Sequence, residues 1–250
     1  IYGNSSRAVA FGSGYAQSED HLDRMLRLFL KARGELGKVE GQSALPQDFI
    51  QRMLLIAEIV DAGWDRVPQA GKDFYQAFAD GINRYIETHP KEKLSWYWKV
   101  EARDVAVYIR FTILRNGWAV AMTDMTGRGS RPQEGSNAWA IAASRSASGH
   151  AMLLANPHLP WQGDVQWYES HLKCPEFDIA AASFIGMPLP TLGHNGEIAW
   201  TATSNPADTA DVYLERIDPQ NPDRYLDNDG QWKLMERRSF HFEVRQPDGS

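Results

Sequence analysis

The sequence has a single cysteine, no long apolar run and no excess of basic charge, and each of these shortages excludes a class of protein. Cys174 is the only cysteine in 250 residues, so no disulfide can form within the chain and cysteine usage does not report the redox compartment. No apolar run approaches the roughly 20 residues that a membrane-spanning helix needs. Lysine and arginine number 26 against 32 acidic residues, which argues against nucleic acid as a partner because phosphate binding needs a basic surface.

The two ends of the chain also lack familiar features. The sequence opens at Ile1 instead of a methionine, shows no signal peptide, and stops in a Gln-Pro-Asp-Gly-Ser run that is typical of a turn. We therefore expect a piece of a longer polypeptide, in which the missing signal peptide says nothing about location.

The chain has enough apolar residues for a sizeable core, and these residues recur with a different period in each half of the sequence. Hydrophobic residues make up 43% of the chain, which argues against global disorder. Residues 18 to about 115 carry apolar side chains at helical spacing. After residue 136 the pattern changes to short segments separated by Gly, Pro, Asn and Asp. Helices followed by strands predict an α+β protein whose helices cover a sheet.

Four helices are expected in the first half. Ser18 is the expected N-cap of the first helix, because Glu19 and Asp20 follow it where acidic side chains suit the helix dipole. Gly34 is expected to end that helix. The apolar stripes of the other three helices span residues 49–60, 70–85 and 104–113.

A segment without apolar period separates the two halves. Residues 123–135 contain three glycines and one proline, which is typical of an exposed linker. We therefore predict a helical α-chain part at residues 1–122, a linker or spacer peptide at 123–135, and the start of a strand-rich β-chain at 136–250. Strands are expected at residues 138–143, 152–155, 166–172, 178–184, 198–203, 211–217 and 239–244.

The linker leads directly into a Gly135–Ser136 pair that can carry chemistry. Glycine has no side chain, so its carbonyl can be approached closely and the Ser136 hydroxyl could attack it. The amide would become an ester, water would complete the cut, and Ser136 would gain a free α-amino group. Such an amine has a reference pKa of about 7.7–8.0, which suits a general base near neutral pH. One residue would then supply nucleophile and base, although the pair alone is also common in ordinary turns.

Four segments, in this order, carry a resemblance to a known family. They read GSGYAQSEDHL at residues 12–22, FADGINRY at 78–85, GSNAWAI at 135–141 followed by LANPHLPW at 154–161, and GHNGEIAW at 193–200. Together they resemble the penicillin amidase family of N-terminal-nucleophile hydrolases, which includes penicillin, cephalosporin, acyl-homoserine-lactone and aculeacin-type lipopeptide acylases. The resemblance spans nearly the whole chain and implies part of an αββα sandwich.

The resemblance implies catalytic roles for single residues. Ser136 would be the nucleophile and its α-amino group the base, after cleavage between Gly135 and Ser136. His158 matches a position that holds histidine in lactone, lipopeptide and cephalosporin acylases and glutamine in penicillin G-type enzymes. It would hold the amine and assist self-cleavage; the alternative is an ordinary loop histidine. The backbone N–H of Ser204 matches one oxyanion donor, and the second, an asparagine, is expected beyond residue 250.

A calcium ion is the one metal that the resemblance suggests. Asp208, Asp211 and the carbonyl of Ala210 match the calcium loop of penicillin G-type members, and oxygen ligands suit this hard cation. Here the alternative is a pair of solvated loop acids. The histidines show no zinc-type spacing, and the chemistry itself requires no cofactor.

An acyl pocket must be apolar, because it receives the fatty or aromatic side of the amide. The candidate substrate-binding residues are Leu159, Trp161, Leu192 and Ile113, each of which could equally belong to the core.

Taken together, we expect a self-processing acylase that cleaves an N-acyl amide such as an acyl-homoserine lactone, a lipopeptide or a β-lactam side chain. The resemblance implies a heterodimer of α and β chains from one precursor, located in the periplasm or secreted. Two alternatives remain. The first is a secreted binding module that kept the fold and lost catalysis, which an uncut Gly135–Ser136 bond would favour. The second is a conventional serine hydrolase using Ser136, His158 and a distant acid, although no G-x-S-x-G elbow supports it.

Overall fold

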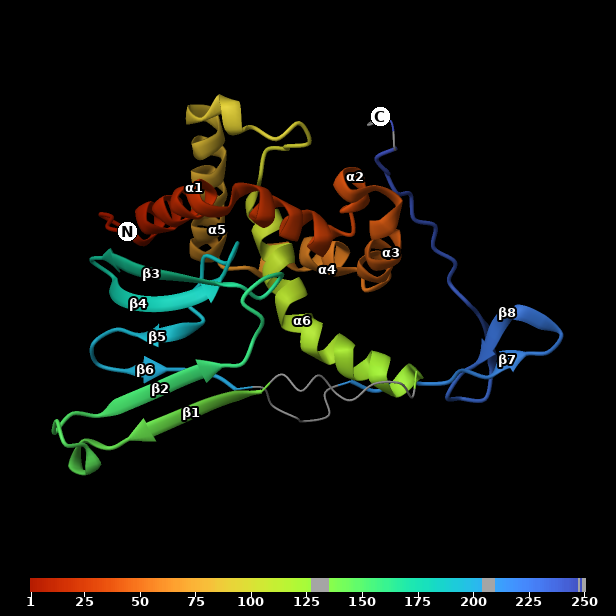
Figure 1. Cartoon of the computed structure of the whole chain (residues 1–250). Helices are drawn as coiled ribbons and strands as arrows, with labels where there is room; N and C mark the ends of the chain where they lie inside the picture. Colours follow the sequence, from red (N-terminus) through yellow and green to blue (C-terminus); the bar gives the residue numbers. More distant parts are fainter. Residues whose placement is uncertain (127–134, 204–209, 247, 249–250) are drawn as a thin grey trace. The chain divides into compact units, whose positions relative to one another are not determined.

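The computed structural model describes residues 1–126, 135–203, 210–246 and 248, and the chain divides into two units (Figure 1). The first unit comprises residues 1–113, 134–205 and 242–250, and the second comprises residues 114–133 and 206–241. The first half of the chain is helical and the second half is rich in strands. The predicted α+β class is therefore confirmed.

Six α-helices form the first half of the described chain, with short 3₁₀ turns between some of them. They are α1 (Ser6–Arg33), α2 (Gly37–Glu40), α3 (Leu45–Met53), α4 (Ile56–Gly63), α5 (Gln69–Thr88) and α6 (Ala102–Thr126). None of the described helices combines the length and apolarity that crossing a bilayer requires. Since α6 runs to Thr126 and residues 127–134 lie outside the described residues, the predicted linker boundaries stay predictions.

The helix boundaries differ from the predicted ones in two places. The prediction of Ser18 as an N-cap was wrong. The N-cap of α1 is Ser5, thirteen residues earlier, and its hydroxyl accepts a hydrogen bond from the Ala8 N–H at 3.2 Å. Ser18 is buried within the helix, and its hydroxyl donates to the Gly14 carbonyl at 2.7 Å. The stripe over residues 49–60 is two helices instead of one, because Leu55 has a left-handed φ of 52° that breaks the helix.

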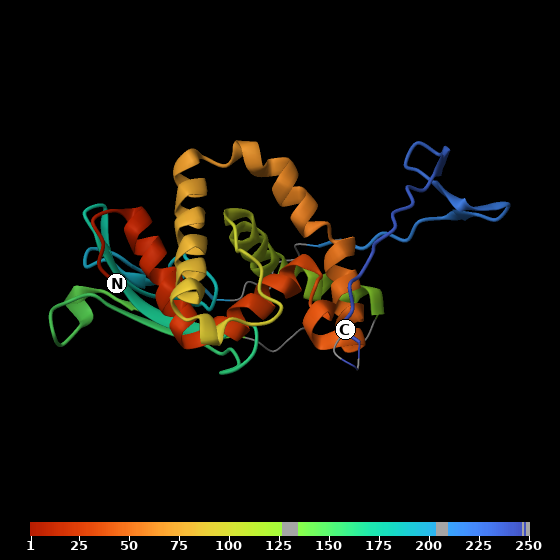
Figure 2. The same ribbon diagram turned by 90° about the horizontal axis from the view of Figure 1, so that it is seen from above.

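The crossing of α1 over α5 is unusually close (Figure 2). A Cβ at Gly14 of α1 would lie 2.1 Å from the Phe78 carbonyl oxygen, and a Cβ at Gly81 of α5 would lie 2.0 Å from the Phe11 carbonyl oxygen. Only glycine permits backbones to approach this closely. Both glycines belong to the resemblance segments, so helix packing accounts for them.

The strands of the described chain form three sheets. The strands β1 (Ser136–Ile141) and β2 (Met152–Pro157) form an antiparallel hairpin. A four-stranded antiparallel sheet has the order β3 (Trp167–Cys174), β4 (Phe177–Phe184), β5 (Leu192–His194) and β6 (Ala199–Trp200). In the second unit, β7 (Ile217–Asp218), β8 (Asn221–Leu226) and β9 (Trp232–Leu234) form the third sheet.

The predicted strands were confirmed where the segment pairs with another strand in a sheet. The expected strands at 138–143, 152–155, 166–172 and 178–184 correspond to β1–β4 with shifted ends, and the one at 198–203 shrinks to β6. The strands expected at 211–217 and 239–244 were wrong apart from Ile217. Alternation of apolar residues indicates an extended chain, but a strand also needs a partner to accept its hydrogen bonds.

Buried polar side chains fix the helices to the four-stranded sheet. Gln17 of α1 accepts a hydrogen bond from the Gly186 N–H at 2.8 Å and donates to the Met187 carbonyl at 3.3 Å. The Tyr108 hydroxyl of α6 donates to the Ile185 carbonyl at 2.8 Å. These bonds give partners to buried backbone groups, and they hold the turn that leads from β4 toward β5.

A further polar contact joins α1 to β3. The Tyr168 hydroxyl donates to the Asp20 carboxylate at 2.9 Å. Burial, together with this hydrogen bond and the Asp20 charge, raises the pKa of Tyr168 well above its ordinary value. Tyr168 therefore remains a neutral hydrogen-bond donor throughout the physiological pH range.

Candidate active site

The β1–β2 hairpin brings Gly135, Ser136 and His158 together. Ser136 is the first residue of β1 and pairs with Pro157 at the end of β2. The ladder continues one step further, because the His158 backbone N–H donates to the Gly135 carbonyl at 3.0 Å. Antiparallel pairing thus places the Gly135–Ser136 bond beside His158, which lies far along the chain.

Two donors converge on the carbonyl of the peptide bond expected to be cut. The Gly135 carbonyl accepts from the Ser136 hydroxyl at 2.6 Å and from the His158 backbone N–H at 3.0 Å. The hydroxyl therefore lies against the group that it would attack, with the bond intact. The His158 N–H points at the oxygen on which negative charge would develop during such an attack.

The His158 side chain is held on the other side of the hairpin from the Ser136 side chain. Its Nε2 lies 3.2 Å from the Asn156 amide nitrogen, and a Cβ built on Gly135 would lie 3.8 Å from its Nδ1. Side chains alternate along a strand, so Gly135 and His158 share one face and Ser136 occupies the opposite one. In the described part of the chain, the ring makes no hydrogen bond to Ser136.

A concavity lies between the hairpin and the four-stranded sheet. Its volume is about 450 Å³, within the range of roughly 300–1,000 Å³ that ligand pockets occupy. Most of the lining side chains are small or apolar, with one carboxylate and one imidazole among them. They are Leu153, Ala155, Trp167, Glu169, Ala180, Ala181, Ala182, Leu192, Gly193, His194, Ala199 and Trp200.

This concavity and the Ser136 hydroxyl lie on the same face of the hairpin. Ala138 pairs with Ala155 and Ala140 pairs with Leu153, so these side chains point to the face that Ser136 occupies. Ser136 is two residues from Ala138, a step of about 7 Å along a strand. The lining residue Ala155 therefore lies one pleat along the hairpin from the Ser136 position.

Comparison with known proteins shows the family of this chain. The model of the penicillin amidase family matches residues 1–250, the whole chain. The chain belongs to the penicillin amidase family.

Individual relatives of this penicillin amidase family member are acyl-homoserine lactone acylases. The acylase PvdQ of Pseudomonas fluorescens strain Pf0-1 is 28% identical over 288 residues, which cover 100% of this chain and 37% of that relative. PvdQ of Pseudomonas putida is 27% identical over 288 residues with the same coverage. The acylase QuiP of Pseudomonas fluorescens strain Pf-5 is 24% identical over 310 residues, covering 98% of this chain and 37% of that relative. The chain thus spans little more than a third of the relatives it matches.

Of the four pocket residues predicted from the sequence of this penicillin amidase family member, one lines the concavity. Leu192 lines it. Leu159 is half-buried, whereas Trp161 is 93% exposed and Ile113 is 71% exposed, and none of the three lines the concavity. Their proposed substrate contacts stay predictions.

Sequence reasoning missed Trp167, Glu169 and His194. They lie on one face of the four-stranded sheet, because Glu169 pairs with Ala182, which pairs with Leu192, and His194 pairs with Ala180. The alternation of side chains along β3 could have indicated that Trp167 and Glu169 share a face. Which residues share a face of the sheet depends on the register between strands, and the sequence alone does not show that register.

Two predicted site residues, Ser204 and Asp208, lie outside the described residues. Ala210 and Asp211 lie in irregular chain of the second unit. Among the residues that the structure describes, no three His, Cys, Asp or Glu side chains lie close enough together to hold a metal ion. Because the expected calcium loop includes Asp208, that site stays a prediction.

The side chain of Cys174 is partly buried at the end of β3. Desolvation and the neighbouring Glu176 carboxylate raise the pKa of the Cys174 thiol. A raised pKa reduces the thiolate fraction, which argues against a nucleophilic role for Cys174.

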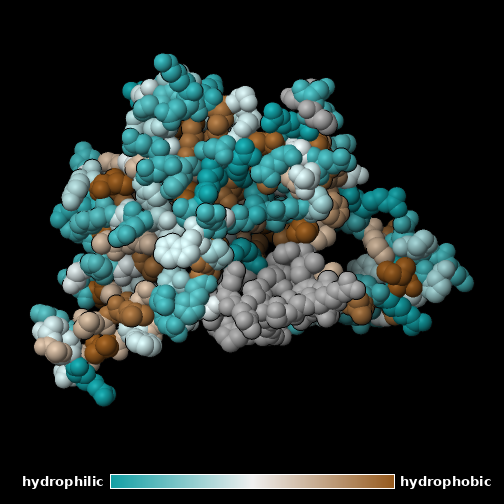
Figure 3. Space-filling view, viewed as in Figure 1, coloured by the Kyte–Doolittle hydropathy of each residue, from teal (hydrophilic) through white to brown (hydrophobic). Residues whose placement is uncertain are grey.

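The outer face of the hairpin is apolar and exposed. It carries Trp139, Ile141, Met152 and Leu154, which are 63%, 39%, 53% and 44% exposed. Figure 3 shows brown and tan side chains over this hairpin at the lower left. The inner face, which carries Ser136, has alanines at Ala138, Ala140 and Ala155 instead. The two faces therefore differ in side-chain size, and the small one adjoins the concavity.

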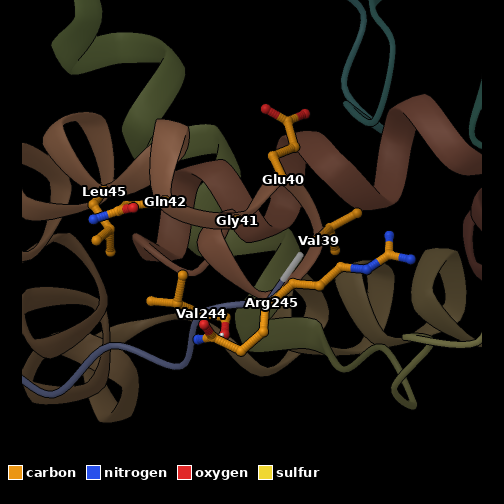
Figure 4. A pocket seen from close by; sticks show the side chains of 8 residues that line it. Val39, Glu40, Gly41, Gln42, Leu45, Val244 and Arg245 are labelled. Atoms are coloured by element: carbon orange, nitrogen blue, oxygen red, sulfur yellow. Dashed lines mark hydrogen bonds between the residues drawn. The ribbon is translucent and has the colours of Figure 1, made fainter. Parts of the chain in front are cut away.

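A second concavity lies beside α2 and offers no catalytic group. It is lined by Val39, Glu40, Gly41, Gln42, Leu45, Val244, Arg245 and Gln246 (Figure 4). None of these side chains is a serine, threonine, cysteine or histidine nucleophile. Its one carboxylate, Glu40, points away from Arg245 in Figure 4 and accepts a hydrogen bond from Arg27 at 3.2 Å. The concavity beside Ser136 is thus the better candidate for a substrate.

Proposed function

We propose that this chain carries the nucleophile-bearing part of a self-processing acylase. The protein would cut itself between Gly135 and Ser136 and then hydrolyse the amide bond of an N-acyl substrate. One observation carries the proposal: the Ser136 hydroxyl and the His158 N–H both bond the Gly135 carbonyl, at 2.6 Å and 3.0 Å.

Self-cleavage would proceed as an acyl shift from nitrogen to oxygen. The Ser136 Oγ forms a bond to the Gly135 carbonyl carbon, and the His158 N–H stabilises the resulting oxyanion. The C–N bond then breaks, and the hydroxyl proton ends on the Ser136 nitrogen. Water hydrolyses the ester, which leaves a carboxylate on Gly135 and both a free amine and a free hydroxyl on Ser136.

Turnover would repeat this chemistry on a substrate. The Ser136 hydroxyl attacks the amide carbonyl and its own amine takes the proton, so that one residue serves as nucleophile and base. The backbone N–H of Ser204, together with an asparagine beyond residue 250, would hold the oxyanion. The amine product leaves after protonation, and water hydrolyses the acyl-enzyme.

The concavity supports an acyl group as the part of the substrate bound next to Ser136. Its alanines leave space, while Leu153, Trp167 and Leu192 supply apolar contact. The names of the relatives and the presence of His158 favour acyl-homoserine lactones or lipopeptides as substrates. A calcium ion at Asp208 and Asp211 would instead favour β-lactam side chains. We further propose a heterodimer of α and β chains that works outside the cytoplasm.

Mass spectrometry of the full-length protein is the direct test. We expect two chains, the second beginning at Ser136, and hydrolysis of N-acyl amides that depends on acyl length. Activity in protein that still holds the Gly135–Ser136 bond would overturn the proposal, because a peptide nitrogen cannot act as the base. A protein that is neither cut nor active would instead support the alternative of a binding module.

Filling the concavity should change the substrate preference without affecting self-cleavage. Ala182 lies on its floor between Glu169 and Leu192 in the sheet. In Ala182→Phe we expect hydrolysis of long-chain amides to fall about 10-fold or more relative to short-chain ones, since one methylene in an apolar pocket is worth roughly 10–200-fold. Chain-length series of kcat/KM measure this ratio.

The matched control is Ala147→Phe, which adds the same ring at an exposed turn between β1 and β2. It should leave the ratio unchanged. Equal losses for all acyl lengths in Ala182→Phe would show that the concavity does not hold the acyl chain.

A further inference from the structure

Asn156 is the one side chain described as bonding the His158 ring. It lies two residues before His158 and pairs with Asn137 in the ladder, so both Asn156 and His158 project from the outer face of the hairpin. The Asn156 Nδ2 lies 3.2 Å from His158 Nε2. Pro157 separates them, and its ring restricts the backbone between them to a φ near −65°.

We propose that Asn156 is a positioning residue that fixes the orientation and the tautomer of His158 for self-cleavage. This inference rests on the proposed function and deepens it. Asn156 does not touch the reacting atoms; it acts through the ring.

The tautomer follows from the donor inventory of the two groups. An amide nitrogen can only donate a hydrogen bond, so His158 Nε2 must accept with its lone pair. In a neutral imidazole the proton then resides on Nδ1. Nδ1 is also the ring nitrogen that faces Gly135, since a Cβ built there would lie 3.8 Å from it. The hydrogen bond thus directs the ring proton toward the peptide bond that is to be cut.

A proton at this position has a use in the acyl shift. When the C–N bond breaks, the Ser136 nitrogen must gain a proton, because an amide anion is a very poor leaving group. The ring gives its Nδ1 proton to that nitrogen. Water takes the proton of the attacking hydroxyl on the opposite face of the hairpin, and the ring regains a proton from water. The net change is transfer of one proton from the Ser136 Oγ to its nitrogen, and the ring ends as it began.

The decisive variant is Asn156→Asp, which keeps the size and shape of the side chain and replaces the donor by an acceptor. A carboxylate opposite Nε2 would hold a proton there and reverse the tautomer. We expect self-cleavage of the full-length protein to slow about 10-fold or more, part of the 10²–10⁴-fold that positioned proton transfer contributes. Asn156→Ala, which leaves the tautomer free, should slow cleavage less.

The control for added charge is Asn137→Asp, the ladder partner of Asn156 on the same face. It introduces an identical carboxylate at a position whose side chain has no described hydrogen bond to the ring, and we expect a cleavage rate within about twofold of the unmodified protein.

The second readout is spectroscopic and does not depend on cleavage. In the uncut Ser136→Ala protein labelled with ¹⁵N-histidine, long-range ¹H–¹⁵N correlation reports which ring nitrogen is protonated. We expect His158 to carry its proton on Nδ1, and Asn156→Asp in the same background to move it to Nε2. The remaining histidine signals show whether the fold is kept.

Each outcome is decisive. A cleavage rate in Asn156→Asp equal to that of the unmodified protein overturns the inference, and so does slow cleavage with the ring proton still on Nδ1. If the unmodified full-length protein is never cut, the proposed function fails first, and the tautomer measurement still tests the contact by itself.

Discussion

Ser136→Ala should abolish both the release of a chain beginning at Ser136 and the hydrolysis of every N-acyl amide. The substitution removes the hydroxyl that bonds the Gly135 carbonyl, which it approaches to 2.6 Å. Without that oxygen no ester and no acyl-enzyme can form, and the uncut peptide nitrogen cannot act as a base. We expect turnover to fall by about 10⁴-fold or more, as happens when the nucleophile of a concerted catalytic unit is lost.

Two further variants make this result specific to Ser136. Ser148→Ala removes a hydroxyl from the exposed turn between β1 and β2, and it should process and hydrolyse normally. Ser136→Cys keeps a nucleophile and should still be cut, with slower turnover. The thermal midpoint of Ser136→Ala should change little, because the loss of one hydrogen bond costs about 1 kcal/mol.

Intact mass spectrometry and acyl-release assays measure the two effects separately. Turnover retained in Ser136→Ala would remove Ser136 from the mechanism. A protein that is cut at Gly135–Ser136 in spite of the substitution would show that another protease makes the cut.

Gly81→Ala should be strongly destabilising, although alanine is the better helix former. A Cβ at this position would lie 2.0 Å from the carbonyl oxygen of Phe11, so α1 and α5 would have to separate. The obstruction is backbone, which cannot rotate away as a side chain could. We expect a loss of about 3 kcal/mol, at the upper end of the range for overpacking, or a fall in Tm of about 6–12 °C for a chain of this size.

Gly71→Ala in the same helix is the matched control and should have the opposite sign. A Cβ there meets nothing closer than a Val67 side-chain carbon at 3.5 Å, which is ordinary contact. Without a clash, alanine is favoured over glycine in a helix by up to about 1 kcal/mol, and we expect a smaller gain at Gly71 because it lies in the first turn of α5. Thermal or denaturant unfolding of both variants measures the difference, and a neutral Gly81→Ala would show that the crossing is looser than described.

The crossing and the site are linked through the four-stranded sheet. Gln17 of α1 and Tyr108 of α6 hold the turn at Ile185–Met187, and the chain returns from that turn to Leu192 in the concavity. The resemblance segments at 12–22 and 78–85 thus build the support, while those at 135–141 and 154–161 build the β1–β2 hairpin and the one at 193–200 builds part of the wall of the concavity.

The sequence by itself determined the class of the fold, and it named the candidate site residues. Apolar residues recur about every 3.6 residues in a helix and every second residue in a strand, and both periods are visible within a short stretch of sequence. The helices of the first half and the main strands of the second half could therefore be predicted. The Gly135–Ser136 pair and His158 could be named because they lie in short segments whose resemblance is specific. The end of α1 at Gly34 was also predictable, since its φ of 65° is a conformation that favours glycine.

Only the tertiary structure decided what those residues contact. The pairing of Ser136 with Pro157 brings His158 to the Gly135 carbonyl and Asn156 to the His158 ring. Register likewise puts Trp167 and Glu169 on one face with Leu192, whereas the alternating segments at 211–217 and 239–244 mostly found no partner strand. Strand pairing joins residues distant in the chain, and a shift of one residue exchanges the two faces. Local sequence carries periodicity, but the choice of partner and register is a property of the folded chain.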